Sequence, residues 1–95
     1  MYGTVMIARL ADGVSADDVH KAGVDWRQSR QVVGFVDDRV LQADDGRVVL
    51  AVRFESKDAY LKLADDPAQD EWWTNTMRPM LAADPEWIDG EWTDI

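Results

Sequence analysis

The side chain best suited to chemistry in this sequence is Tyr60, in a segment that reads "SKDAYLKLADD". Ser56 is a suitable helix cap, and one side of the helix after it is apolar, with Ala59, Tyr60, Leu63 and Ala64. Tyr60 is therefore predicted to point toward the sheet. Because a buried tyrosine hydroxyl requires a hydrogen-bond partner, it either contacts a phenolic ligand or reaches a backbone carbonyl.

A second group of residues is suited to holding an aromatic ligand. The aromatic members are Trp26, Phe54, Trp72 and Trp73, and the polar members are Asn75 and Arg78. Pockets are mostly apolar with a few polar anchors, so this combination fits a substrate-binding wall. The alternative is that the aromatic residues form core and that Arg78 pairs with an acid.

The pair Trp72 and Trp73 has a geometric constraint of its own. Adjacent helical residues point about 100° apart, so the two indoles cannot share the middle of one buried stripe. Trp73 lies on the side of two methionines, and we expect it to be core, with Trp72 at the rim of any cavity.

Other chemistries lack the residues they require. Cysteine is absent, which excludes disulfides and thiolate sites, and His20 is the only histidine. His20 lies at the edge of a helical stripe without a second histidine, so we interpret it as a surface residue. Paired acids lack the alternating spacing of a calcium loop, and the glycines do not cluster to hold phosphate. We predict no metal site.

Composition predicts one globular domain over residues 1–95, because 46% of residues are apolar and five are tryptophan. The net charge of -9 repels phosphate and anionic lipid, so nucleic acid and membranes are poor partners. No apolar run approaches the roughly 20 residues of a membrane span, and the start lacks the features of a signal peptide. We expect a cytoplasmic protein.

The pattern predicts strands and helices in the order β-α-β-β-α-β. The strands are residues 2–10, 34–43, 47–55 and 86–93, with a hairpin at Asp45-Gly46. Ser15 caps the first helix, in which Gly23 is expected to allow close packing, and Ser56 and Asp66 cap two later helical pieces. Pro79 predicts a helix end or kink near Thr76.

This order is the α+β, ferredoxin-like arrangement, a four-stranded antiparallel sheet with helices on one face. The strand over residues 47–55 has Val48, Leu50, Val52 and Phe54 on one face, but the other face is also partly apolar. Helices on one side leave that second face bare. We therefore predict a homodimer formed through the sheet faces.

Three short motifs carry a resemblance to a known family: Gly34-Phe35, Phe54-Glu55-Ser56 and Ala59-Tyr60. With the element order, they resemble the antibiotic biosynthesis monooxygenase (ABM-like) family of the dimeric α+β barrel superfamily. The resemblance implies a homodimer with facing sheets and a cavity between sheet and helices. Haem-degrading relatives use an Asn on the first strand, a Trp at the end of the third strand and a haem-ligating His on a later helix. Thr4 and Met6 lie nearest the first position, Phe54 replaces the Trp, and the later helix has no histidine, which argues against haem degradation.

The resemblance implies binding of an aromatic or polyketide-like phenol, with cofactor-independent monooxygenation as its enzymatic form. Tyr60, or a water, would then favour deprotonation of the phenol, and the resulting carbanion would react directly with dioxygen. No cofactor is implied. The alternative is a non-catalytic dimeric binding or interaction module of the same fold, whose cavity is filled by its own side chains.

Overall fold

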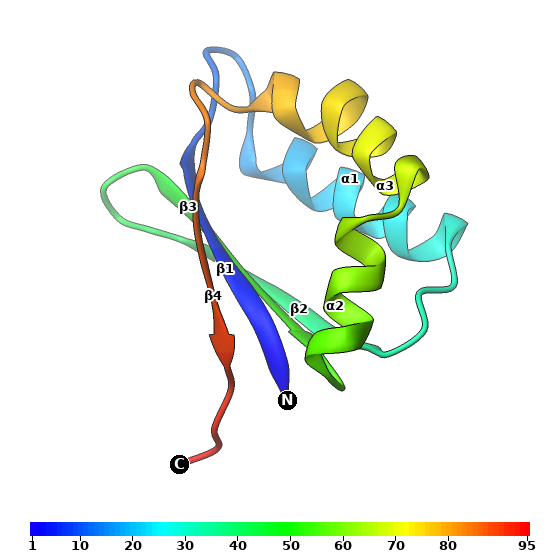
Figure 1. Ribbon diagram of the computed structural model, residues 1–95. Helices are drawn as coiled ribbons and strands as arrows, with labels where there is room; N and C mark the ends of the chain where they lie inside the picture. Colours follow the sequence, from blue (N-terminus) through cyan, green and yellow to red (C-terminus); the bar gives the residue numbers. More distant parts are fainter.

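The computed structural model describes residues 1–95 as a sheet covered by helices on one face (Figure 1). The elements are β1 (Tyr2–Arg9), α1 (Ala16–Ser29), β2 (Phe35–Gln42), β3 (Arg47–Phe54), α2 (Lys57–Ala64), α3 (Pro67–Trp72), the π-helical turn η1 (Trp73–Met77), the 3-10 turn η2 (Arg78–Met80) and β4 (Glu86–Glu91). This confirms the expected α+β, ferredoxin-like fold. None of the helices is long and apolar enough to cross a membrane.

The sheet has the strand order β2-β3-β1-β4, and all neighbouring strands are antiparallel. Thr4 in β1 pairs with Val52 of β3 on one side and with Asp89 of β4 on the other. Directly paired residues point to the same face of a sheet. Three strands therefore present side chains to the helices at this level.

Helix α1 begins as the sequence predicts, with Ser15 and Asp18 forming a reciprocal capping box. Val19, Ala22 and Trp26 are buried along one stripe. The expectation for Gly23 is wrong, because a Cβ placed there would meet no atom within 4 Å. Gly23 faces open space on the cavity side of α1.

The two later helices also begin at the predicted caps. The Ala59 N–H donates to Ser56 Oγ at 3.2 Å, and the Ala68 N–H donates to Asp66 Oδ1 at 2.9 Å. Between β2 and β3 the hairpin turns at Gly46, whose φ of 88° lies in the left-handed region that favours glycine. These caps and this turn determine where the helices begin and where the hairpin reverses.

The predicted break near Thr76 occurs earlier and in a different form. Regular α3 ends at Trp72, and the Arg78 N–H donates to the Trp73 carbonyl, five residues back. A proline at position 79 has no N–H to donate to the preceding turn and crowds it sterically. The helix therefore widens into a π-turn, as helices often do at functional sites, and then tightens into η2.

Only 11 of the 95 residues are buried, so the filled part of the interior is small. We call it the packed end, and it consists of Met6, Ala8, Val19, Ala22, Met77 and Leu81. It lies where the first part of α1 and η1 meet the sheet. Trp26, Val48 and Phe54 are buried outside this end.

The face of the sheet turned away from the helices, here called the open face, carries Val5, Ile7, Leu41, Val49, Ala51 and Ile88. Leu41 and Ile88 are 62% and 53% exposed. Arg53 Nε donates to Asp37 Oδ1 at 2.7 Å on the same face, and this hydrogen bond lowers the pKa of Asp37. The open face is therefore an uncovered apolar surface. Its charged residues Arg53 and Asp37 already pair with each other.

Candidate functional site

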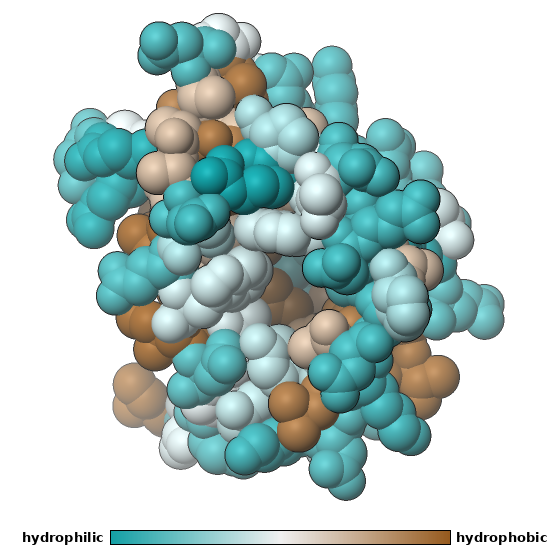
Figure 2. All heavy atoms as spheres, turned by 45° about the horizontal axis from the view of Figure 1, so that its top comes forward, coloured by the Kyte–Doolittle hydropathy of each residue, from teal (hydrophilic) through white to brown (hydrophobic).

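A cavity of about 900 Å³ lies between the sheet and the helices. Of the 26 residues that line it, 16 are hydrophobic, and they come from all four strands and from every helical element except η2. Figure 2 shows a recess in the surface with hydrophobic atoms at its floor. Both the size and the lining are in the range of small-molecule sites.

One wall of the cavity is a continuous row of aromatic rings, the aromatic belt: Trp72, Trp26, Phe35, Phe54 and Tyr60. The successive ring centroids are 6.2, 5.4, 5.9 and 5.4 Å apart. These spacings and the tilted ring planes are those of favourable aromatic pairs. The belt crosses the cavity from α3, through α1 and the sheet, to α2.

The two adjacent tryptophans divide their contacts. Trp73 packs against both clusters of the packed end and against Trp87, at 5.2 Å between ring centroids. Trp72 contacts only one of those clusters and turns its ring toward Trp26. Both indoles are half-buried and both line the cavity, so Trp73 has the larger share in the core.

At one end of the belt, three oxygen-bearing side chains form a polar corner: Thr4, Tyr60 and Asp89. The Tyr60 hydroxyl donates to Asp89 Oδ1 at 3.0 Å, and Thr4 Oγ1 donates to the Ile88 carbonyl at 3.3 Å. Burial, followed by the hydrogen bond to Asp89, raises the pKa of Tyr60. Tyr60 is therefore a neutral hydrogen-bond donor, and its partner is a carboxylate rather than the backbone carbonyl considered above.

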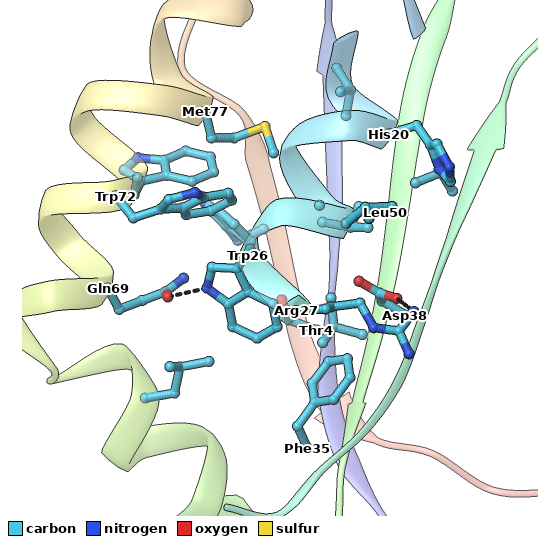
Figure 3. Close-up of a pocket in the computed structure, with 18 of the residues that line it drawn as sticks. Thr4, His20, Trp26, Arg27, Phe35, Asp38, Leu50, Gln69, Trp72 and Met77 are labelled. Carbon is cyan, nitrogen blue, oxygen red and sulfur yellow. Dashed lines mark hydrogen bonds and ion pairs between the residues drawn. The ribbon is translucent and has the colours of Figure 1, made fainter. Parts of the chain in front are cut away.

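A second polar group holds the middle of the aromatic belt in place. Trp26 Nε1 donates to Gln69 Oε1 at 2.6 Å (Figure 3). Arg30 Nη1 donates to the same oxygen at 3.2 Å. Arg30 also donates to the Ala68 carbonyl at 2.9 Å. The buried Trp26 ring is therefore held in the cavity wall by a hydrogen bond as well as by its contacts with Phe35 and Trp72.

The side of the cavity between α1 and β2 is bridged by one ion pair. Arg27 Nη1 lies 3.3 Å from Asp38 Oδ1, and its guanidinium lies 5.5 Å from the centroid of the Phe35 ring. In Figure 3, His20 lies farther along the same side of α1. It is exposed at the rim, in agreement with its interpretation as a surface residue.

Five of the seven predicted site residues line the cavity, namely Tyr60, Trp26, Phe54, Trp72 and Trp73. Asn75 and Arg78 do not line it, and Arg78 pairs with an acid, as the alternative expected. Asn75 is exposed on η1, and Arg78 Nε donates to Asp84 Oδ1 at 2.9 Å. The π-turn changes the direction of every side chain after Trp73, which a regular helical wheel does not foresee.

The sequence reasoning missed four residues that shape the site: Thr4, Phe35, Gln69 and Asp89. In the sequence, Phe35 carries only a family motif. Its pairing with Phe54 places it on the helix side of the sheet. Asp89 follows Trp87 by two residues, so the two side chains lie on the same face of β4. This spacing indicates that Asp89 faces the helices if Trp87 does. Gln69 and Thr4 carry no local signal. No cluster of three or more histidine, aspartate or glutamate side chains is arranged to hold a metal ion.

Comparison with known proteins places the chain by its fold. No family model matches the sequence, and no curated protein matches it. Among solved structures, the ActVA-Orf6 monooxygenase of Streptomyces coelicolor, in complex with nanaomycin D, has a TM-score of 0.74 and 22% identity. The match covers 99% of this chain and 88% of that one.

Two further structures extend the comparison. A Nitrosomonas europaea protein named as an antibiotic biosynthesis monooxygenase has a TM-score of 0.62 and 20% identity, covering 96% and 97% of the two chains. The haem degrader MhuD of Mycobacterium tuberculosis, with two haems bound in its active site, has a TM-score of 0.74 and 15% identity, covering 100% and 99%. The chain therefore has the ferredoxin-like α+β fold of the ABM-like proteins.

Proposed function

We propose that this protein binds an aromatic small molecule in the cavity between its sheet and helices. The observation that carries the proposal is the aromatic belt, which leads through a space of about 900 Å³ to the polar corner. Flat rings give an aromatic ligand favourable stacking contacts, and the polar groups of the corner orient the ligand by hydrogen bonds. The nanaomycin D complex of the S. coelicolor monooxygenase supports this ligand class.

The enzymatic form of the proposal is cofactor-independent oxidation of a polyketide-like phenol such as an anthrone. The phenol loses its proton, and the electron-rich carbon reacts with dioxygen. The ring CH2 becomes a carbonyl, and the second oxygen atom leaves as water, so the substrate supplies all the electrons. In this reaction the belt excludes bulk water from the reacting carbon.

Tyr60 has a narrower role in this reaction than the sequence suggests. Its raised pKa and its hydrogen bond to Asp89 make it a donor that orients groups in the corner, not the base that removes a proton. The non-catalytic alternative requires an interior filled by side chains. The cavity is open, which favours a ligand over that alternative.

Binding is tested by titrating the protein with a hydroxylated tricyclic aromatic and following tryptophan fluorescence. Gly23 lines the cavity with free space at its Cβ position, so Gly23→Phe places a ring in the ligand's volume. We expect affinity to fall by roughly tenfold or more. Gln28→Phe adds the same ring to an exposed site on α1 outside the cavity, and binding should be unchanged.

Turnover is tested separately by oxygen consumption with an anthrone substrate. We expect Tyr60→Phe to abolish oxidation, because the phenyl ring keeps the packing but loses the hydrogen bond that orders the corner. Binding of the aromatic ligand should be weakened far less than turnover. Unchanged turnover would remove Tyr60 from the reaction and leave a binding protein.

We also propose that two copies pair through the open face. Leu41 and Ile88 are exposed there, half-buried Val5, Ile7 and Val49 lie beside them, and no helix covers this side of the sheet (Figure 1). With only 11 buried residues, one chain alone has a small core for 95 residues. A second copy would bury both apolar faces at once.

Light scattering tests the pairing, with an expected mass of twice 10.8 kDa. Ile7→Glu places a charge in the middle of the open face and should shift the protein to monomer. Val33→Glu makes the same kind of change in the exposed loop before β2, where Val33 is 89% exposed, and should leave the dimer intact. A wild-type mass of 10.8 kDa at micromolar concentration contradicts the pairing.

A further inference from the structure

The charges around the cavity are unbalanced. Four aspartates line it, Asp17, Asp38, Asp70 and Asp89, against one arginine, Arg27. The guanidinium of Arg27 already pairs with Asp38, so it is not free to bind a second anion at full strength. The whole chain carries a net charge of -9, which adds to the negative potential. An anionic ligand therefore meets repulsion at the entrance and finds no unpaired cation inside.

Asp89 is the acid at the Tyr60 end of the aromatic belt, where it is exposed to solvent. It lies on edge strand β4, opposite Thr4, with its side chain on the helix side of the sheet. One carboxylate oxygen, Oδ1, accepts the Tyr60 hydroxyl, and no side chain of the protein donates to the other oxygen, Oδ2. A carboxylate is an acceptor with room for several donors. Asp89 is thus oriented by Tyr60 and has acceptor capacity left over.

We propose that Asp89 anchors an uncharged aromatic ligand by accepting a hydrogen bond from its hydroxyl or amino group, and that the cavity discriminates against carboxylates. The inference rests on the proposed ligand site and names the class of molecule that the site takes. Stacking on the half-buried rings of Phe35 and Trp72 holds the ligand, and Asp89 sets which end of the ligand enters first.

The discrimination follows from hydrogen-bond chemistry. A phenol donates to Asp89 and forms a charge-assisted bond, which is stronger than a neutral one. A carboxylate of the same ring system cannot donate, and it brings a like charge toward Asp89, which repels it. Haem, with its two propionate carboxylates, belongs to the disfavoured class. The inference therefore separates this chain from the haem-binding neighbour that shares its fold.

The same corner suits the proton transfer that oxidation requires. When the phenol O–H bond breaks, the proton passes to Asp89 and the electron pair stays on the phenol oxygen. The Tyr60 hydroxyl, released from a protonated Asp89, can turn and donate to the new phenolate. Both residues then contact the reacting group, with Asp89 as the proton acceptor and Tyr60 as the donor.

Calorimetric titration with a matched pair of probes tests the inference. At pH 7, 2-naphthol is neutral and 2-naphthoate is an anion on the same ring system. We expect 2-naphthol to bind the wild-type protein about tenfold more tightly, or better. Asp89→Asn keeps an oxygen that accepts from Tyr60 but replaces the carboxylate by an amide that donates. This variant should lose about tenfold in 2-naphthol affinity and gain in 2-naphthoate affinity.

The outcomes distinguish a failure of the selectivity from a failure of the ligand site. If both probes bind the wild-type protein equally, or if 2-naphthoate binds more tightly, the ligand site stands and the selectivity for neutral donors is overturned. If Asp89→Asn leaves the ratio of the two affinities unchanged, Asp89 is not the anchor. If neither probe binds, the ligand site itself fails, and the inference fails with it.

Discussion

The packed end of this molecule and its hollow end, the part lined by the aromatic belt and the polar corner, share helix α1 and strand β1, yet one is filled and the other is open. At the packed end, Met6 and Val19 are 1% and 4% exposed and contact their neighbours on all sides. At the hollow end, the side chains are larger, but they contact one another along the belt and leave space beside them. Large aromatic residues therefore need not mean a filled core.

The difference has a physical cause in side-chain size and direction. Val19 and Ala22 let α1 and η1 approach closely around Met77. Farther along α1, Trp26 meets Trp72 of α3 ring to ring, so two large indoles lie between these helices. Gly23, between these regions, adds no side chain to fill the space beside it. The cavity remains open there.

The largest contrast is expected from truncations at the two ends. Met6→Ala removes a side chain that is 1% exposed and should lower the free energy of unfolding by about 2–5 kcal/mol. Leu63→Ala removes a half-buried side chain that already faces the cavity, so it should cost about 1 kcal/mol or less. Urea denaturation at one fixed protein concentration measures both. Equal losses would show that the hollow end is packed in solution.

Glycine replacements sharpen the same contrast with a smaller effect. Gly23→Ala should raise the free energy of unfolding by about 0.5–1 kcal/mol, because alanine favours the helix and its methyl group enters free space. Gly3→Ala is the opposite control, since its Cβ would collide with the Val52 carbonyl and the Trp92 indole. Thermal unfolding compares the two variants. A loss of stability in Gly23→Ala would mean that the cavity closes around Gly23.

The smallest effect concerns the polar corner at alkaline pH. The pKa of Tyr60 is raised in the folded protein, so the folded state holds this proton more tightly than the unfolded chain. The resulting stability is present below the unfolded pKa of about 10 and is lost as pH rises through the folded value. Tyrosinate absorbance should show Tyr60 ionising late. Tyr60→Phe should remove that late step, and a spectrum without such a step would argue against a half-buried, Asp89-bound hydroxyl.

Much of the fold could be predicted from local sequence signals. The caps at Ser15, Ser56 and Asp66 and the turn at Gly46 all depend on neighbouring residues, and each was identified correctly. The ABM-like resemblance rested on motifs of this structural kind. It led to the right fold for the same reason.

The site could be predicted only in part, because its geometry depends on residues far apart in the chain. Tyr60 and Asp89 are 29 residues apart, and Trp26 and Gln69 are 43 apart, so nothing local links them. The π-turn moved Asn75 and Arg78 away from the cavity through a backbone change that side-chain periodicity does not encode. Whether the space beside Trp72 is empty depends on how α1, α3 and the sheet pack together.

The five tryptophans offer the most direct test of ligand binding at the hollow end. Their indole N–H signals in a nitrogen–proton NMR spectrum report separate places: Trp26 and Trp72 lie on the belt, while Trp92 donates to the Val52 carbonyl at 3.1 Å beside the open face. Titration with 2-naphthol should shift the signals of Trp26 and Trp72 and leave that of Trp92 in place. A spectrum in which Trp92 shifts and Trp26 does not would place the ligand outside the cavity and contradict the proposed function.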